Sequence, residues 1–211
     1  MTNPLAPRRR DTLAGLASAL ALGGCIPAFP LGGPDPRTFR VTPKYTFADD
    51  LPTVTWSLAV AEPSAERTLD TNRIAVVTNG TNVDYVALAF WIDRAPSMLQ
   101  TLIVQSFRNS GRIAQVGTTR DRLRADFLLT SDLRAFQLNR GNGQDQIRVR
   151  LDVQLLRMPQ RDPVGSESIA ADWVPAGSGV DAAVGAFDEA TGRVLKDLVA
   201  WTLRSGQRGL R

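Results

Sequence analysis

The sequence predicts an α+β protein with two layers, in which a mid-chain helix and a long C-terminal helix cover one face of a mostly antiparallel sheet. Three observations support this fold class. Several segments place apolar residues at every second position, which is typical of strands that bury one face. Two other segments repeat apolar residues every three or four positions, as amphipathic helices do. One of these two is the last long segment of the chain, and the sequence contains no internal repeat.

The first half of the chain contributes four strands to this prediction. We expect a short one over residues 38–41 and a clearer one over residues 54–60, where apolar and small polar residues alternate. Residues 73–78 and 83–89 supply the other two. Because Asn79-Gly80 between them is a tight-turn signal, these two strands are expected to form a hairpin.

A helix follows the hairpin. Pro96 opens its first turn, where a missing N–H group costs no hydrogen bond. The turn sequence Asn109-Ser110-Gly111 ends it, and residues 113–116 read as a short strand. The inner stripe of the helix is expected to consist of Leu99, Leu102, Ile103, Ser106 and Phe107.

The clearest hairpin signal lies in the second half of the chain. One alternating run extends from Leu123 toward Leu138, and a second covers residues 149–155. The turn segment Asn139-Arg140-Gly141-Asn142-Gly143 lies between them. The two runs therefore predict an antiparallel hairpin with one face on the core.

Two further elements complete the predicted fold. Residues 166–174 add one more strand after the hairpin. A long helix from Asp181 to Arg204 then ends the chain, with charged residues on its outer face. Its inner face is expected to consist of Val184, Phe187, Val194, Leu198 and Trp201.

The N-terminal segment has the layout of a bacterial lipoprotein signal. Three arginines at residues 8–10 precede a stretch of Leu, Ala and Gly that is too short to span a bilayer. The stretch ends in the lipobox run Leu22-Gly23-Gly24-Cys25. We therefore expect residues 1–24 to be a signal peptide, and Cys25 to carry diacylglycerol and an N-acyl chain such as palmitate. A plain secretory signal with a chance cysteine, or a buried N-terminal helix, is the alternative.

The same segment allows two export routes. Arg9-Arg10-Asp11-Thr12-Leu13 is similar to a twin-arginine signal, in which an arginine pair is followed by two variable residues and a leucine. Alternatively, the arginines only supply the positive charge that any export signal needs. Residues 25–37 are rich in Pro and Gly, so we expect a stiff, lipidated tether there. A single α+β periplasmic domain is expected over residues 38–211.

Composition excludes several classes of function. The chain has no histidine, which removes Ser-His-Asp catalysis, histidine metal sites and a histidine proton shuttle. The formal charge of +4 falls to about +2 after signal cleavage, and arginine alternates with acidic residues instead of clustering, so nucleic acid is not an expected partner. We expect no catalytic residue, no metal and no cofactor apart from the lipid on Cys25.

The apolar run Phe90-Trp91-Ile92 lies among polar neighbours just before the helix that Pro96 opens. One interpretation assigns the run to the core. In the other, Phe90 and Trp91 lie near a surface that contacts a protein partner or an acyl chain, because aromatic side chains are good anchors. The sequence leaves both interpretations open.

Over about residues 25–205 the chain resembles the auxiliary lipoproteins of ABC-type transport systems, which include the lipoprotein of the paraquat-inducible Pqi system. After the lipobox cysteine and the strand containing Phe39-Arg40-Val41, Val60-Ala61-Glu62-Pro63 precedes a segment from Leu69 to Val76. This segment is similar to the family's Leu-Asp-Arg sequence followed by a strand. Trp91 and the Pro96 helix, the arginine-containing hairpin and the C-terminal helix then follow in the family's order.

The chain departs from the family pattern at two places. In Asp70-Thr71-Asn72-Arg73 the basic residue comes later than the family pattern leads us to expect. In Asp93-Arg94-Ala95 we expect a glutamate that is not there. These departures concern the subfamily more than the family.

The resemblance implies a protein that is not an enzyme and that docks on an Mce-domain protein. That partner works with an ABC permease and an ATPase, which move lipids or hydrophobic solutes between membranes. The implied location is the periplasmic face of the outer membrane, and Ile26 agrees because it is not the aspartate that retains lipoproteins at the inner membrane. A lipid-binding carrier is the alternative function, a secreted carboxylate enzyme is a third, and a homo-oligomer is implied by family analogy only.

Overall fold

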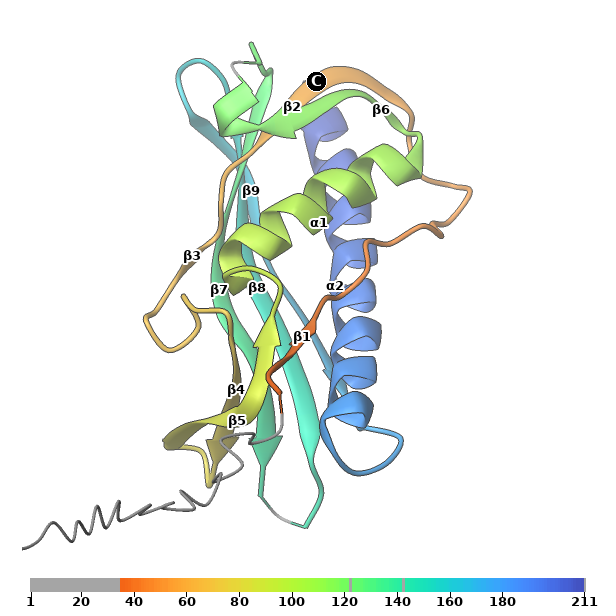
Figure 1. The fold of residues 1–211 in the computed structure, drawn as a ribbon. Helices are drawn as coiled ribbons and strands as arrows, with labels where there is room; N and C mark the ends of the chain where they lie inside the picture. The colour runs from red at the N-terminus through yellow and green to blue at the C-terminus, as the bar shows by residue number, and fades with distance from the viewer. Residues whose placement is uncertain (1–34, 122, 142, 211) are drawn as a thin grey trace, which may run out of the picture. The chain divides into compact units, whose positions relative to one another are not determined.

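The computed structural model describes residues 35–121, 123–141 and 143–210. The predicted signal peptide, Cys25 and the predicted tether as far as residue 34 lie outside these residues. The described chain forms one sheet, two α-helices and a short 3₁₀ helix (Figure 1). In chain order its elements are β1 (Arg37–Phe39), β2 (Val54–Val60), β3 (Ser64–Ala65), β4 (Arg73–Thr78), β5 (Asn82–Trp91), α1 (Ala95–Ser110), β6 (Ile113–Thr118), η1 (Thr119–Asp121), β7 (Phe127–Arg140), β8 (Gln146–Arg157), β9 (Asp162–Trp173) and α2 (Val180–Gly209).

Strand β7 organises the sheet. β8 pairs with it in antiparallel orientation along nearly its whole length, and β9 pairs with β8 in the same way. On its other side, β7 pairs in parallel with three shorter strands in succession, namely β2, β3 and β4. β6 extends the sheet beyond β2, whereas β5 and then β1 extend it beyond β4. The long strands and the β4–β5 hairpin are thus antiparallel as expected, while the remaining short strands join in parallel.

Both predicted hairpins are confirmed, and the element ends differ in places. β7 begins at Phe127 instead of Leu123. Just before it, the carboxylate of Asp126 accepts a hydrogen bond of 2.7 Å from the backbone N–H of Ser57. β3 was not expected, since two residues give no periodic signal. α2 continues to Gly209, five residues past the predicted end.

A β-bulge in β7 keeps one face of the strand on the core. The buried residues Leu129 and Leu133 occupy odd positions, whereas the buried residues Phe136 and Leu138 occupy even ones. The register with β8 shifts between Leu133 and Ala135. Such a shift inserts one extra residue, which reverses the alternation of faces. The change of parity along this run is therefore the sequence signal of the bulge.

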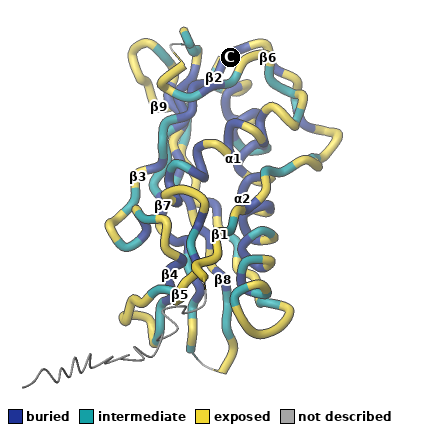
Figure 2. Tube along the Cα trace, viewed as in Figure 1, coloured by how far each residue is buried: buried dark blue, intermediate teal, exposed yellow. Residues whose placement is uncertain are grey.

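The helices α1 and α2 lie on one face of the sheet (Figure 1), and the buried residues concentrate between the two layers (Figure 2). All five residues of the predicted inner stripe of α1 are buried. Trp91, Phe136 and Phe187 meet at the centre, with ring centroids 5.2 Å, 5.0 Å and 4.9 Å apart. Rings in such tilted and edge-on arrangements contribute about 0.5–1.5 kcal/mol per pair beyond the area that they bury.

Candidate functional site

The most distinctive surface of the described chain surrounds the short connection between β5 and α1. Only Ile92, Asp93 and Arg94 separate the end of β5 from the start of α1. Because the connection is so short, its side chains leave in fixed directions. A network of ion pairs lies on one side of it and an apolar groove lies on the other. We call this region the β5–α1 corner.

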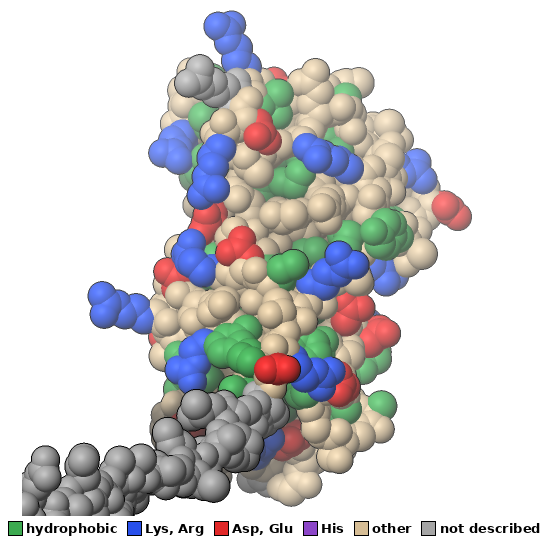
Figure 3. Space-filling view, in the orientation of Figure 1, with side chains coloured by type: hydrophobic (Ala, Val, Ile, Leu, Met, Phe, Trp, Pro, Cys, Tyr) green, Lys and Arg blue, Asp and Glu red, His purple; other side chains and the backbone are tan. Residues whose placement is uncertain are grey.

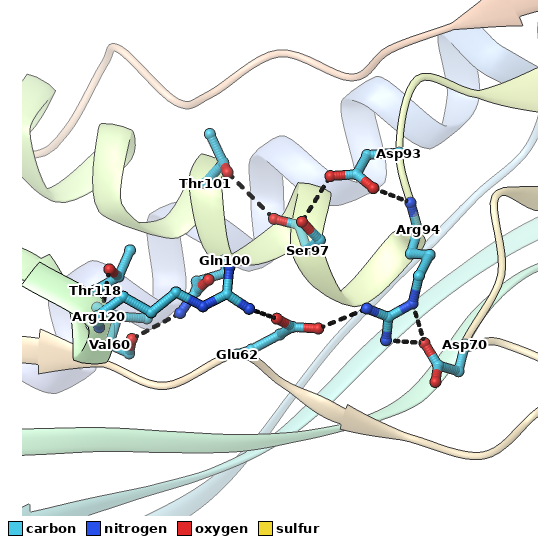
Figure 4. A network of polar contacts seen from close by, with 10 residues as sticks. All are labelled: Val60, Glu62, Asp70, Asp93, Arg94, Ser97, Gln100, Thr101, Thr118 and Arg120. Carbon is cyan, nitrogen blue, oxygen red and sulfur yellow. Dashed lines mark hydrogen bonds and ion pairs between the residues drawn. The ribbon is translucent and has the colours of Figure 1, made fainter.

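Arg94 is the centre of the ion-pair network (Figure 4). Its guanidinium donates hydrogen bonds to the carboxylate of Asp70, one of them from Nε at 2.8 Å, and to the carboxylate of Glu62 at 3.0 Å. Arg120 donates a hydrogen bond of 2.9 Å to the other carboxylate oxygen of Glu62. The hydrogen bond from Arg94 to Asp70 is the main cause that raises the pKa of the guanidinium above its ordinary value. The network therefore joins two arginines to two carboxylates.

The network joins four segments that are distant in the sequence. Glu62 lies after β2, Asp70 before β4, Arg94 before α1 and Arg120 in η1. Backbone hydrogen bonds reinforce one of these junctions, because the N–H groups of the residues that flank the β5–α1 connection bond to the loop before β4 at 2.7 Å and 3.0 Å. Exposed ion pairs contribute little individually, whereas a network with good geometry fixes the relative positions of its segments. We interpret this network as the support of the corner.

Asp93 fixes the first turn of α1. Its carboxylate accepts a hydrogen bond of 2.6 Å from the hydroxyl of Ser97 and one of 2.7 Å from the backbone N–H of Arg94. These two bonds, the Ser97 bond first, lower the pKa of Asp93 below its ordinary value. One turn further, the buried side chain of Gln100 donates a hydrogen bond of 3.0 Å to the carbonyl of Val60 and so attaches α1 to β2 (Figure 4).

The apolar side of the corner is a groove with a volume of about 490 Å³ between residues 40–45 and α1. Tyr45 and Ile92 form its rim and are 67% and 63% exposed, more than any other large hydrophobic residue of the described chain. Figure 3 shows hydrophobic side chains interspersed with charged ones on the face that α1 occupies. We call this feature the Tyr45–Ile92 groove; its other lining residues are Arg40, Val41, Thr42, Pro43, Asp93, Met98, Thr101, Leu102 and Gln105.

The wall of the groove is held in place by polar contacts. The backbone N–H and the hydroxyl of Thr42 donate hydrogen bonds of 2.6 Å and 2.9 Å to Asp188 on α2. The backbone N–H of Lys44 donates a bond of 3.0 Å to the hydroxyl of Ser106, and Asn109 donates one of 3.0 Å to the carbonyl of Lys44. The segment that carries Tyr45 is therefore attached to both helices. A groove with a fixed wall loses little conformational entropy when a ligand binds.

The structure resolves the two interpretations of the run Phe90-Trp91-Ile92. Trp91 is 1% exposed and packs against Phe136 and Phe187, so its ring belongs to the core and is not available to a partner. Phe90 is half-buried. The member of the run that reaches the surface is Ile92, because it follows the last residue of β5. Tyr45 gave no sequence signal, since it lies in an irregular segment without periodicity.

The described residues contain no group of three or more histidine, cysteine, aspartate or glutamate side chains placed to hold a metal ion. Neither helix within residues 35–210 is long and apolar enough to cross a membrane.

Residues 42–199 match the family described as the ABC-type transport auxiliary lipoprotein component. The chain belongs to this family. Two of the segments that carried the resemblance, Val60-Ala61-Glu62-Pro63 and the one from Leu69 to Val76, are joined by Arg94 through Glu62 and Asp70. Arg94 itself lies in Asp93-Arg94-Ala95, where the chain departs from the family pattern. By family membership, the protein is a lipoprotein associated with transport.

Two individual proteins are similar to this chain. The structure of protein XCC0632 from Xanthomonas campestris is 30% identical, covers 82% of this chain and 97% of its own, and superimposes with a TM-score of 0.78. The uncharacterized protein bll6063 of Bradyrhizobium diazoefficiens is 30% identical over 156 residues, which are 72% of this chain. This chain spans only 40% of the length of that relative.

Proposed function

We propose that this lipoprotein is anchored through Cys25 to the periplasmic face of the outer membrane. There it serves as the docking component of an Mce-type ABC transporter that moves lipids or hydrophobic solutes. Its partner is the Mce-domain protein that works with the permease and the ATPase. The observation that carries the proposal is the Tyr45–Ile92 groove, a preformed apolar surface on a member of the auxiliary lipoprotein family.

The groove has the properties of a protein-binding hot spot. Tyrosine and methionine are enriched at such sites, and the energetically important residues are apolar anchors with a polar rim. Tyr45 and Ile92 at the rim supply the anchors, the buried Met98 lies beneath them, and Arg40 and Asp93 are the charged residues of the lining. Truncating an anchor of this kind typically costs more than about 1 kcal/mol of binding free energy.

The packing between the layers favours docking over carriage of a lipid inside the body. Phe136 and Phe187 fill the space between the sheet and α2, and Leu198 on the same helix is fully buried. An acyl chain could enter this space only by displacing core side chains, which cores resist because they are close-packed. The groove itself is apolar enough to hold part of an acyl chain, so a lipid carrier that uses this surface is the second candidate.

The docking proposal is tested with the double variant Tyr45→Ala, Ile92→Ala. Crosslinking and co-purification from membranes should capture the Mce-domain protein with the wild type and at least about tenfold less with the variant, which corresponds to about 1.4 kcal/mol. The melting temperature should not change, because both side chains are exposed.

The matched control is the double variant Val83→Ala, Val174→Ala, which truncates two other exposed apolar residues. Capture should be normal with this control. Equal capture by both double variants would contradict the docking role of the groove. Mass spectrometry of the mildly extracted protein distinguishes docking from lipid carriage. If the wild type holds stoichiometric lipid and the Tyr45→Ala, Ile92→Ala variant does not, the groove binds lipid and the carrier function is favoured.

A further inference from the structure

Strand β9 is the long open edge of the sheet. It pairs with β8 over Asp162–Trp173 and has no other strand neighbour in the part of the chain that the structure describes. Within the described residues, its backbone makes no hydrogen bond outside that ladder. Ser166, Glu167, Ser168 and Ala170 are exposed. Half of the backbone N–H and C=O groups of an edge strand point away from the sheet, where they can pair with an additional strand.

The other two edges of the sheet are less available. β1 has only three residues. β6 has six, and the side chain of Arg108 donates a hydrogen bond of 3.2 Å to the carbonyl of Val116 in its middle. The start of β9 is also protected, because Pro163 cannot donate a hydrogen bond and Val164 interrupts the register with β8. The regular stretch from Gly165 to Trp173 remains, with neither proline nor lysine nor arginine.

The acidic side chains of β9 favour a partner strand that carries basic residues. The strand contains Asp162, Glu167 and Asp172 and no basic residue. A second copy of β9 would bring no basic side chain to Glu167, because the strand has none, whereas opposite charges across strands are favourable. A favourable pair of opposite charges already exists between β9 and β8. Arg148 of β8 lies directly opposite Asp172 and donates hydrogen bonds of 2.8 Å and 3.0 Å to its carboxylate.

A groove with a volume of about 430 Å³ lies beside the open edge, between β9 and α2. Ile169, Ala200 and Trp201 supply its apolar surface. Two carboxylates line the groove, Glu167 at its rim and Asp197 on α2, and Glu167 makes no ion pair among the described residues. Of its two arginines, Arg204 is paired with Asp50, and Arg208 donates a hydrogen bond of 3.2 Å to the hydroxyl of Ser205. An added strand would point alternate side chains into this groove, where it would meet an apolar surface and an unpaired carboxylate.

We propose that the Gly165–Trp173 edge accepts an extended segment of a partner protein as an additional strand. This segment alternates small apolar residues with lysine or arginine and places a basic side chain opposite Glu167. The site is separate from the Tyr45–Ile92 groove, and the proposal does not depend on the identity of the transporter partner. Backbone hydrogen bonds would provide the affinity, and the charge at Glu167 would provide the selectivity.

The probe is a synthetic eight-residue peptide that alternates valine or threonine with lysine, compared with the same peptide containing glutamate in place of lysine. With the mature lipidated chain in detergent micelles, the lysine peptide should bind roughly fivefold more tightly at low salt. Hydrogen exchange measured by mass spectrometry should slow over residues 165–173. The variant Glu167→Lys should reverse the preference, whereas Glu189→Lys on the exposed face of α2 should leave it unchanged.

Three outcomes would overturn the proposal. If the two peptides bind with equal affinity, the charge at Glu167 does not select the partner. If a peptide binds without slowing hydrogen exchange over residues 165–173, it does not bind as an added strand. If exchange over this segment slows with rising protein concentration in the absence of peptide, a second copy of the chain occupies the edge instead. None of these outcomes bears on capture of the Mce-domain protein through the Tyr45–Ile92 groove.

Discussion

At the scale of single residues, Asp93 and Arg94 stabilise different parts of the β5–α1 corner. Arg94 reaches outward to two acidic residues and joins the loops around it. Asp93 turns back on the helix, where its carboxylate accepts bonds from Ser97 and from the backbone N–H of Arg94. A carboxylate at a helix N-terminus also interacts favourably with the helix dipole. Neighbouring residues of opposite charge thus fix the helix start and its surroundings separately.

The lowered pKa of Asp93 predicts a pH-dependent contribution to stability. A carboxyl group whose folded pKa lies below the ordinary value of 3.8 stabilises the fold above that value, and the contribution is lost as pH falls through the folded pKa. Asp93→Asn should therefore lower the urea midpoint at pH 7, and the difference from wild type should shrink at about pH 2. The control is Ser97→Ala, in which a carbon-13 titration should find the Asp93 pKa closer to its ordinary value. An Asp93→Asn difference of equal size at both pH values would contradict this account.

At the scale of elements, the C-terminal turns of α2 depend on a close approach to the sheet. Gly206 is buried, and a Cβ atom there would lie 2.5 Å from Cζ2 of Trp56 on β2. Gly185 lies on the same helix, where a Cβ atom would meet no atom within 4 Å. Two glycines of one helix thus have opposite roles, since one permits packing and the other only weakens the helix.

Alanine substitutions should separate these two roles. Gly206→Ala should destabilise the protein by about 1–3 kcal/mol, because the buried indole of Trp56 must move. Gly185→Ala should stabilise it by about 0.5–1 kcal/mol, because alanine is the better helix former and the space is open. Urea unfolding of both variants measures the difference. A Gly206→Ala protein at least as stable as Gly185→Ala would rule out the close contact as the reason for this glycine.

At the scale of the whole molecule, the chain combines an attachment signal with a body that offers two surfaces. The lipobox cysteine remains a prediction from the sequence, and family membership supports the attachment that it implies. The Tyr45–Ile92 groove and the β9 edge belong to different elements of the body, so each can be removed without the other. Loss of one proposed surface is thus expected to leave the other intact.

Attachment is tested by Cys25→Ser. Without the thiol, no diacylglycerol can be added, so the protein should leave the membrane fraction or remain as an uncleaved precursor. The body should keep the melting temperature of the wild type, because the core of the described residues begins at Val41, beyond the tether that the sequence predicts. Fractionation of inner and outer membranes locates the wild type. A Cys25→Ser protein that is still lipidated and membrane-bound would contradict the anchor.

The sequence by itself determined the two long helices, the longer strands and their order, but not β3 or η1. Alternation and helical spacing were sufficient for the hairpins, for α1 and for most of α2, because a residue's face is fixed by its position within its own element. The order of these elements, together with the segments Val60-Ala61-Glu62-Pro63 and Leu69 to Val76, also indicated the family that residues 42–199 match. The sequence also contains the change from odd to even buried positions at the bulge after Leu133, although the periodic pattern alone did not reveal the bulge.

Only the tertiary structure decided which residues meet. Trp91 became core and Ile92 became surface because β5 ends between them, and a shift of one residue at a strand end reverses burial. The parallel pairing of the short strands with β7 depends on contacts between distant segments, which no local pattern specifies. Tyr45 joined the groove, and Glu62, Asp70 and Arg94 joined one network, for the same physical reason: long-range packing, not sequence spacing, brings their side chains together.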